Sequence, residues 1–419
     1  MGPDLRRTSE QDTTPETAEL EARLAQHPVA RYPAQHATTA FHLATLHLQA
    51  GRVAAAVPLL GAAYDVFRQL GMKLEQAKTL TMHGVAQRET GRSDLAAQSF
   101  ERAATSFGEL DQPTEEAAAS YNLGLTLQEQ GDGARAKEAM ARAYELFLAA
   151  GHLAQAGAAA RESGISLLTS GELAAALSTL EDAAALAERA GDLPGLGAAA
   201  NGLGLTHLAV DDAAAAVTAF SRAVGAFPRS MRGSEHAMVK ANLAVAYERV
   251  GNDARARLSA RQALAVSSID PPVRAQAQQL LNRLIATTGA DLLSVLTEEP
   301  PDRWPVILRE EVLRWCDAGP VERLTAVDGF VDGLLSRPEA SYDLAESLIA
   351  ILVELPPAPY ADMVTTIVQV TGQLAPGDEE RLRSIMGSAM ARFAMPQWQR
   401  LASSLNAAAT TAGQSTGWR

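Results

Sequence analysis

Apolar residues recur with helical spacing through most of the chain, in stretches separated by short turn signals. Residues 118–130 form one such stretch, and residues 134–150 form the next after a turn at Gly131. Apolar positions three and four residues apart predict amphipathic helices, and a glycine between two of them predicts a left-handed helix end followed by a turn. The local pattern therefore predicts pairs of helices joined by tight turns.

The same pattern repeats every forty residues. Turn glycines stand at Gly51, Gly91, Gly131, Gly171 and Gly251, with Asp211 in the remaining place. Seven residues before each turn stands a residue with almost no side chain: Ala44, Gly84, Gly124, Gly164, Gly204 and Ala244. Alanine also stands five and twelve residues after every turn. Columns that stay in step across six units predict an array of helical hairpins.

Four of the small residues are glycines inside a predicted helix, where each costs roughly 1 kcal/mol relative to alanine. Close approach of the partner helix explains them, because a larger side chain at such a crossing would overpack it at a cost of roughly 1–3 kcal/mol. We therefore expect the hairpins to nest through these columns.

These columns resemble the tetratricopeptide repeat (TPR), since Ala136, Met140 and Ala143 after Gly124 fit its second helix. The usual proline at the end of the unit occurs only as Pro228, and the unit has forty residues, which is similar to kinesin light chains and Rap-type bacterial regulators. The aromatic residue of the TPR first helix is absent; Ala40, Leu80, Ser120, Ala160, Ala200 and Lys240 stand there. The resemblance implies a right-handed α-solenoid of about six TPR-like hairpins. With the predicted helices that follow it, which indicate a C-terminal helical domain, the expected fold is all-α.

The expected organisation follows from where the columns begin and end. We expect a disordered segment over residues 1–17, a capping helix and linker over 18–36, six repeats over 37–272, a terminal capping helix over 273–289, a helical domain over 290–409 and a disordered tail over 410–419. A degenerate continuation of the solenoid is the alternative to a separate C-terminal domain.

Composition narrows the compartment and the partners. Aromatic residues make up only 5% of the 419 residues, which favours close-packed helices over sheets. The net charge of −13 argues against nucleic acid or an anionic membrane as the main partner. The single cysteine, Cys316, permits no internal disulfide, and the N-terminus lacks the apolar core of a signal peptide, so we expect a reducing, cytoplasmic location.

Motifs for catalysis and cofactor binding do not occur in the sequence. It contains no phosphate-binding loop, no HExxH or CxxC motif and no EF-hand spacing, so we expect no cofactor, no metal and no catalytic residue. Cys316 stands between Trp315 and Asp317 on a predicted helix and is interpreted as a packed thiol.

A candidate binding surface lies on the side of the first helices that would line the concave face of the array. Its mixed charged, amide and aromatic side chains suit an extended peptide or a helix. The candidate ligand-binding residues are Phe41, Lys78, Arg88, Tyr121, Gln128, Arg161, Asn201, Glu248 and Arg249. The alternative is that these residues are only the exposed faces of amphipathic helices.

The sequence thus favours a non-enzymatic protein–protein interaction scaffold that binds a peptide or protein segment in the concave groove. The C-terminal domain would supply a second surface or a homodimer contact. One alternative is a helical enzyme or accessory factor of bacterial metabolism, with a pocket between the solenoid and the C-terminal domain near Trp304, Trp315 and Cys316. Another is a peptide-sensing regulator similar to Rap-type proteins; without room for a DNA-binding motif before Ala37, it would act on a protein.

Overall fold

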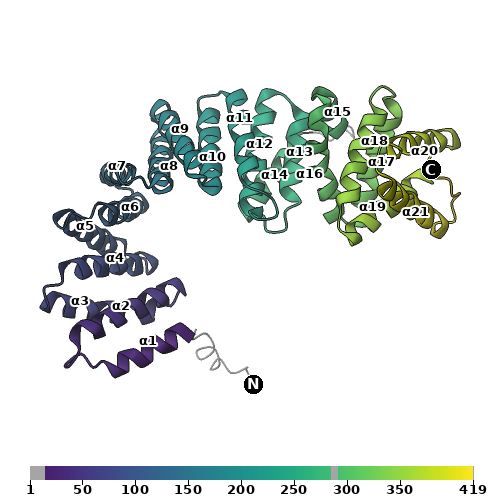
Figure 1. Cartoon of the computed structure of the whole chain (residues 1–419). Helices are drawn as coiled ribbons and strands as arrows, with labels where there is room; N and C mark the ends of the chain where they lie inside the picture. The colour runs from purple at the N-terminus through teal and green to yellow at the C-terminus, as the bar shows by residue number, and fades with distance from the viewer. Residues whose placement is uncertain (1–14, 285–290, 419) are drawn as a thin grey trace, which may run out of the picture. The chain divides into compact units, whose positions relative to one another are not determined.

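The computed structural model describes residues 15–284 and 291–418, and all regular structure in these ranges is helical. The chain forms two compact units, which divide between Thr206 and His207. The predicted all-α class is confirmed (Figure 1).

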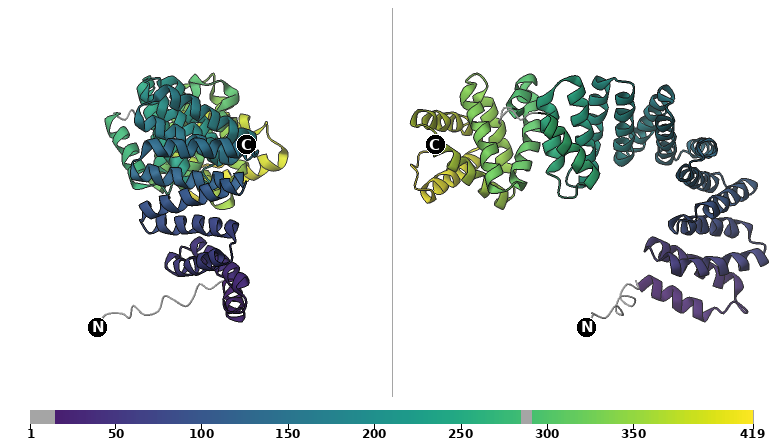
Figure 2. Two further views of the ribbon diagram at one scale, coloured as in Figure 1. Left: turned by 90° about the vertical axis from the view of Figure 1, so that its left-hand side faces the viewer. Right: turned by 180° about the vertical axis from the view of Figure 1, so that it is seen from behind.

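Unit 1 consists of hairpins that follow one another in chain order, with their helices side by side (Figures 1 and 2). A preceding helix, α1, packs against the first hairpin. The helices are α1 (Pro15–Gln26), α2 (Pro33–Gln49), α3 (Val53–Gln69), α4 (Lys73–Glu89), α5 (Ser93–Glu109), α6 (Pro113–Gln130), α7 (Gly133–Ala149), α8 (Leu153–Ser170), α9 (Leu173–Ala190) and α10 (Leu193–Ala209), whose last residues belong to unit 2. Each even-numbered helix from α2 is the first helix of a hairpin.

The predicted turns are present. Gly131 ends α6 with a φ of 80°, and its amide and that of Asp132 donate to the carbonyls of Gln128 and Leu127 at 3.0 and 2.9 Å. Asp211 takes the same left-handed conformation with a φ of 63°, as Asp and Asn do more readily than other non-glycine residues. A column with one aspartate among glycines therefore marks a single backbone conformation.

The glycines inside the first helices leave room for large side chains. A Cβ at Gly164 would lie 2.5 Å from Cγ of Leu180, and one at Gly84 would lie 2.6 Å from Cε1 of Phe100. A Cβ at Gly124 would lie 2.8 Å from Cγ of Met140. These glycines thus accommodate the large apolar residue of the second helix in their own hairpin.

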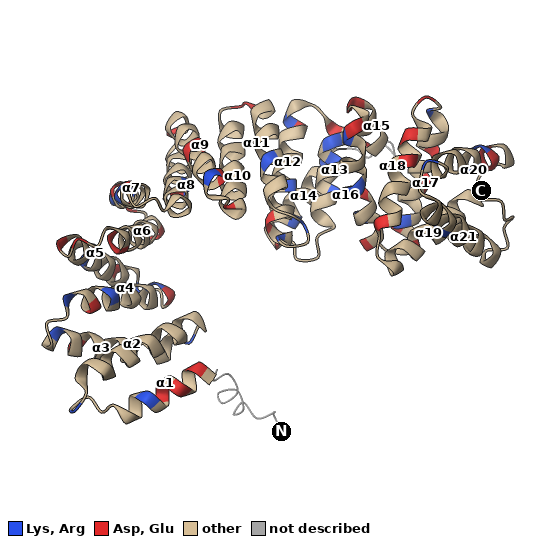
Figure 3. Cartoon of the chain, in the orientation of Figure 1, with Lys and Arg blue, Asp and Glu red and all other residues tan. Residues whose placement is uncertain are grey.

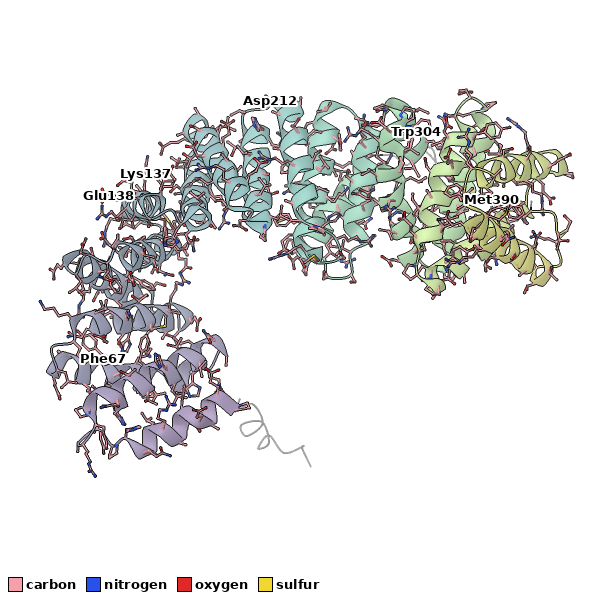
Figure 4. The ribbon with its side chains drawn as sticks, in the orientation of Figure 1. Phe67, Lys137, Glu138, Asp212, Trp304 and Met390 are labelled. Atoms are coloured by element: carbon pink, nitrogen blue, oxygen red, sulfur yellow. The ribbon has the colours of Figure 1, made fainter. Side chains whose placement is uncertain are left out.

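The alanine and aromatic columns of the second helices form the interior of unit 1. Ala136 and Ala143 are completely buried. The phenylalanine column is buried as well; Phe67 is 2% exposed and packs against Ala37, Ala40 and Ala63 (Figure 4). Small residues of α2 and α3 thus pack around this aromatic side chain.

Unit 2 contains the last repeat helices and the C-terminal helices. The repeat helices are α11 (Ala213–Ala226), α12 (Gly233–Val250), α13 (Asp253–Leu264) and α14 (Pro271–Arg283). The C-terminal helices are α15 (Asp291–Glu298), the 3₁₀ turn η1 (Pro301–Arg303), α16 (Trp304–Asp317), α17 (Pro320–Ser336), α18 (Ser341–Glu354), α19 (Pro357–Thr371), α20 (Pro376–Met390) and α21 (Met395–Thr411).

Packing in the C-terminal part differs from packing in the repeats. Consecutive helices pack most closely in the repeats, whereas α16, α18 and α20 form one layer and α17, α19 and α21 form the other. Leu258 of α13 belongs to the same core as Trp304 and Met390, both labelled in Figure 4. The last repeat helices and the C-terminal helices therefore share a core, so the compact units do not divide at residue 290.

The predicted ends of the chain differ from the structure in two places. Residues 1–14 lie outside the described residues, and α1 begins at Pro15 within the segment expected to be disordered. At the other end, Trp418 is 2% exposed and its indole lies under the guanidinium of Arg383, with 4.7 Å between Cζ and the ring centroid. The side-chain oxygen of Asn406 accepts from the amides of Gly417 and Trp418, so this expected disordered tail is packed against α20 and α21.

Candidate functional site

Seven of the nine predicted binding residues lie on first helices in unit 1, and the other two lie on α12 in unit 2. All are half-buried except Arg249, which is exposed. The structure brings four of the seven together on α4, α6 and α8: Arg88, Tyr121, Gln128 and Arg161.

Tyr121 of α6 is at the centre of this group. It packs against the alanine-rich core around Ala143 and Phe147. Burial raises the pKa of its phenol, and the Glu162 carboxylate raises this pKa further, while the guanidiniums of Arg161 and Arg88 lower it. A protonated phenol at neutral pH is available to donate a hydrogen bond to a ligand.

Arg161 and Glu162 form an ion pair beside Tyr121. Nη2 and Nε of Arg161 donate to one carboxylate oxygen of Glu162 at 2.6 and 3.2 Å. Gln128 of α6 donates from Nε2 to the backbone carbonyl of Glu162 at 3.3 Å, which joins the two helices. Glu162 was not among the predicted residues, although the adjacent Arg–Glu sequence was a signal for it.

Arg88 of α4 carries the second guanidinium of the group. Its Nη1 atom is buried and has no hydrogen-bond partner among the described residues. A buried guanidinium nitrogen without a partner is destabilising, and a carboxylate that displaced the side chains covering it would satisfy it with a charge-assisted hydrogen bond. We refer to Arg88, Tyr121 and Arg161 as the Arg–Tyr patch; it offers two cations and one phenol against the single carboxylate of Glu162.

The remaining predicted residues make other contacts. Phe41 packs against the core around Leu60, and Lys78 makes no ion pair with a described residue. Asn201 lies half-buried on α10. In unit 2, the carboxylate of Glu248 accepts from Arg283 of α14 at 2.8 and 3.1 Å, and Arg249 donates to the Leu208 carbonyl at 2.7 Å. Both side chains therefore have hydrogen-bond partners within unit 2.

The region of Trp304, Trp315 and Cys316 is the other site that the sequence suggested. Trp304 and Trp315 are 6% and 2% exposed, and the Trp315 ring packs against Phe330 with 5.8 Å between centroids. Burial raises the pKa of the Cys316 thiol to about 11, with a further contribution from the Asp317 carboxylate. A thiol with this pKa is protonated at neutral pH and is a poor nucleophile.

Charged residues of both signs gather where α13, α15 and α16 meet (Figure 3). The carboxylate of Asp291 accepts from Arg257 and Arg261, each at 2.8 Å. Glu311 is 2% exposed and accepts from Gln262 at 2.9 Å and from Arg314 at 3.1 Å. Because these buried charges already have partners, we interpret the network as a structural connection within unit 2.

The described residues contain no group of three or more His, Cys, Asp or Glu side chains arranged to hold a metal ion. In the same ranges, no helix combines the length and apolar character needed to cross a bilayer.

Comparison with known proteins finds similar solved structures only. No family model matches the chain, and no curated protein matches it either. Solved structures do match. The apo form of RapI is 12% identical with a TM-score of 0.46, covering 63% of this chain and 90% of that one. The apo quorum sensor NprR from B. thuringiensis is 12% identical with a TM-score of 0.48, covering 80% and 92%.

A putative kinesin light chain with TPR-like repeats from Podosopora anserina is 15% identical with a TM-score of 0.36, covering 52% of this chain and 98% of that one. At these identities and TM-scores the likeness assigns no activity or partner to this chain. The repeating helical hairpins of the described residues themselves fit a TPR-like repeat architecture.

Proposed function

We propose that unit 1 is a non-enzymatic interaction module that binds a peptide or protein segment through a carboxylate at the Arg–Tyr patch. The buried Nη1 of Arg88, which has no partner among the described residues, carries this proposal. The carboxylate is an acidic side chain of the partner or its C-terminus.

The surroundings of Arg88 suit such a ligand. The Tyr121 phenol supplies a second donor, and the Arg161 guanidinium, which is paired with Glu162, lies beside it. Ile165 and Leu205, on the first helices α8 and α10, are each 37% exposed and would contribute apolar contacts to an extended segment. Charge-assisted bonds would fix the register of the segment, while the apolar contacts would add affinity.

The experiment starts from short displayed peptides selected for binding to the full chain, followed by fluorescence anisotropy with one labelled peptide. Hydrogen bonds to charged groups contribute ~1.5–3 kcal/mol, so Arg88→Gln should weaken binding by about tenfold or more. The matched control is Arg189→Gln, which removes an exposed arginine on α9 and should leave binding unchanged. Equal affinity of the Arg88→Gln variant and the wild type would rule out the patch.

The cytoplasmic location and the homodimer remain parts of this proposal. Exposed aliphatic side chains on the C-terminal helices support the dimer contact: Val306 is 67% and Val321 is 80% exposed. Sedimentation equilibrium of the full chain tests it, with a monomer at all concentrations as the contrary result.

A further inference from the structure

A cavity of about 550 Å³ lies between α7 and α9, and residues of α8 also line it. Its floor contains Met140, Ala160 and Leu167, and its walls contain Tyr144, Ser163 and Thr179. Ligand pockets typically have volumes of about 300–1,000 Å³. This cavity is therefore large enough for an apolar side chain together with flanking backbone.

The cavity exists because one repeat departs from the column pattern. Ser163 stands where four other repeats have leucine, namely Leu43, Leu123, Leu203 and Leu243, and where one has His83. Three of these leucines are 3–7% exposed. The equivalent cleft between α5 and α7 contains Leu123 and has a volume of about 320 Å³. Replacement of leucine by serine thus leaves an empty place for an aliphatic side chain.

The two clefts also differ in the ion pairs that bridge them. Across the α5–α7 cleft, Arg142 pairs with Glu116 at 2.8 Å and Arg135 pairs with Glu101 at 3.2 Å. Forty residues later these four positions are Asp182, Ala156, Ala175 and Ala141. Neither bridge can form there, and the α7–α9 cleft keeps only a looser pair between Lys137 and Glu172, with 3.6 Å between Nζ and Oε2.

Asp182 reverses the charge of its column, in which Arg102, Arg142 and Arg222 occupy the equivalent positions. It lines the cavity, is exposed, and makes no ion pair with any residue in the described ranges. Lys137 lies on the side of α7 that faces this cavity, whereas its neighbour Glu138 lines the α5–α7 cleft (Figure 4). With Glu172 partly neutralised by Lys137, the unpaired charge at the mouth is the carboxylate of Asp182.

Four hydroxyls of the cavity lining also have no hydrogen-bond partner in the described part of the chain. The hydroxyls of Tyr144, Ser163, Ser166 and Thr179 line the cavity and make no hydrogen bond with another described residue. Each hydroxyl can donate and accept, which matches the alternating N–H and C=O groups of a peptide backbone. Ser163 lies two residues from Arg161, about 200° around α8, so the cavity and the Arg–Tyr patch are on opposite faces of that helix.

We propose that this cavity is a second binding site, which takes a protein segment carrying a leucine-type side chain and, beside it, a basic residue. The aliphatic side chain fills the place that leucine occupies in the other repeats. The basic residue pairs with Asp182, and the backbone between them bonds to the wall hydroxyls.

The test uses short random peptides displayed and selected on the full wild-type chain, with counter-selection on the Ser163→Leu variant. Ser163→Leu restores the column residue and should keep the helicity of the wild type, because the fold accepts leucine at this position in four other repeats. We expect the enriched peptides to share a leucine or methionine near a lysine or arginine. For a synthetic peptide of this kind, Ser163→Leu should weaken binding by about thirtyfold or more, as loss of a central anchor does.

Two further variants complete the design. Ser163→Ala leaves the cavity open and should bind the peptide within about threefold of the wild type. Asp182→Arg changes only a surface position and should weaken binding of the peptide by about tenfold. The affinity for a peptide whose basic residue is replaced by glutamine should not fall in this variant.

Three results would overturn the proposal. The first is that the counter-selection enriches no peptide, and the second is that the peptide binds Ser163→Leu and wild type with equal affinity. The third is that the wild type forms a dimer which Ser163→Leu dissociates, because the occupant of the cavity would then be a second copy of the chain. Arg88→Gln should not change this binding, so the patch and the cavity can fail independently.

Discussion

Alanine substitutions in the glycine column of the first helices test the packing of the hairpins. At Gly164 a new Cβ would lie 2.5 Å from Cγ of Leu180, a branched side chain buried on all sides. Alanine gains up to ~1 kcal/mol over glycine in a helix, but overpacking costs ~1–3 kcal/mol. We therefore expect Gly164→Ala to lower the local free energy of unfolding by about 1–2 kcal/mol, because Leu180 has little room to move.

Two other positions complete this series. A Cβ at Gly124 would meet the flexible side chain of Met140 at 2.8 Å, so the helix gain and the packing cost should nearly cancel. Gly61, in the second helix α3, has no atom within 4 Å of its Cβ position, so Gly61→Ala should stabilise its hairpin by about 0.5–1 kcal/mol.

Native-state hydrogen exchange of the backbone amides is the suitable assay, because stability in a repeat array is local. It reports the free energy of opening for α8, α6 and α3 separately. The expected order of the changes is Gly61→Ala stabilising, Gly124→Ala near zero and Gly164→Ala destabilising. Equal stabilisation by Gly164→Ala and Gly61→Ala would refute the close contact between Gly164 and Leu180.

Three further outcomes are expected. Asp291→Asn should destabilise unit 2 by about 3–5 kcal/mol in denaturant unfolding, because it leaves the buried Arg257 guanidinium without its carboxylate; a change below 1 kcal/mol would contradict this. Burial lowers the pKa of His83, so the unfolded chain binds more protons below about pH 6.5 and unit 1 should lose stability as the pH falls from 7 to 5. His83→Leu should reduce that loss in hydrogen exchange of α4, and an unchanged pH dependence would argue against it. Because the pKa of Cys316 is about 11, iodoacetamide should label its thiol at least about a hundredfold more slowly at pH 7.5 than free cysteine, and equal rates would contradict its burial.

The repeat columns predicted the helical hairpins and their turns because each column reports one local requirement. The forty-residue spacing located the left-handed residues, including Asp211, and the alanines that are buried at Ala136 and Ala143. The sequence did not predict which side chains the glycines of the first helices contact. Gly164 meets Leu180 of its own hairpin, whereas the sequence indicated only that a neighbouring helix comes close.

The candidate site was predictable only in part. The helical register placed Arg88, Tyr121 and Arg161 on one side of the first helices, and the charges of both arginines act on the Tyr121 phenol in the structure. The register did not show that Glu248 would be bonded to Arg283, because that contact depends on how α14 packs against α12. A contact with a residue outside the repeat columns, such as Arg283, cannot be predicted from those columns.

Two other features show why tertiary context mattered. Trp418 follows a polar segment, yet Arg383 and Asn406 hold it against α20 and α21. The cavity next to Ser163 did leave a signal, since serine interrupts a leucine column. Comparison of that column across repeats would have indicated a gap, although not that the bridging ion pairs are missing as well.

The most direct test of the central claim is a double-mutant cycle between the Arg88 guanidinium and the carboxylate of a selected peptide. Affinities are measured for the wild type and Arg88→Gln, each with the peptide and with its counterpart in which the carboxylate is converted to an amide. If the carboxylate binds at the Arg–Tyr patch, the two changes should be coupled by about 1.5–3 kcal/mol. Strictly additive effects would show that Arg88 and the carboxylate do not meet.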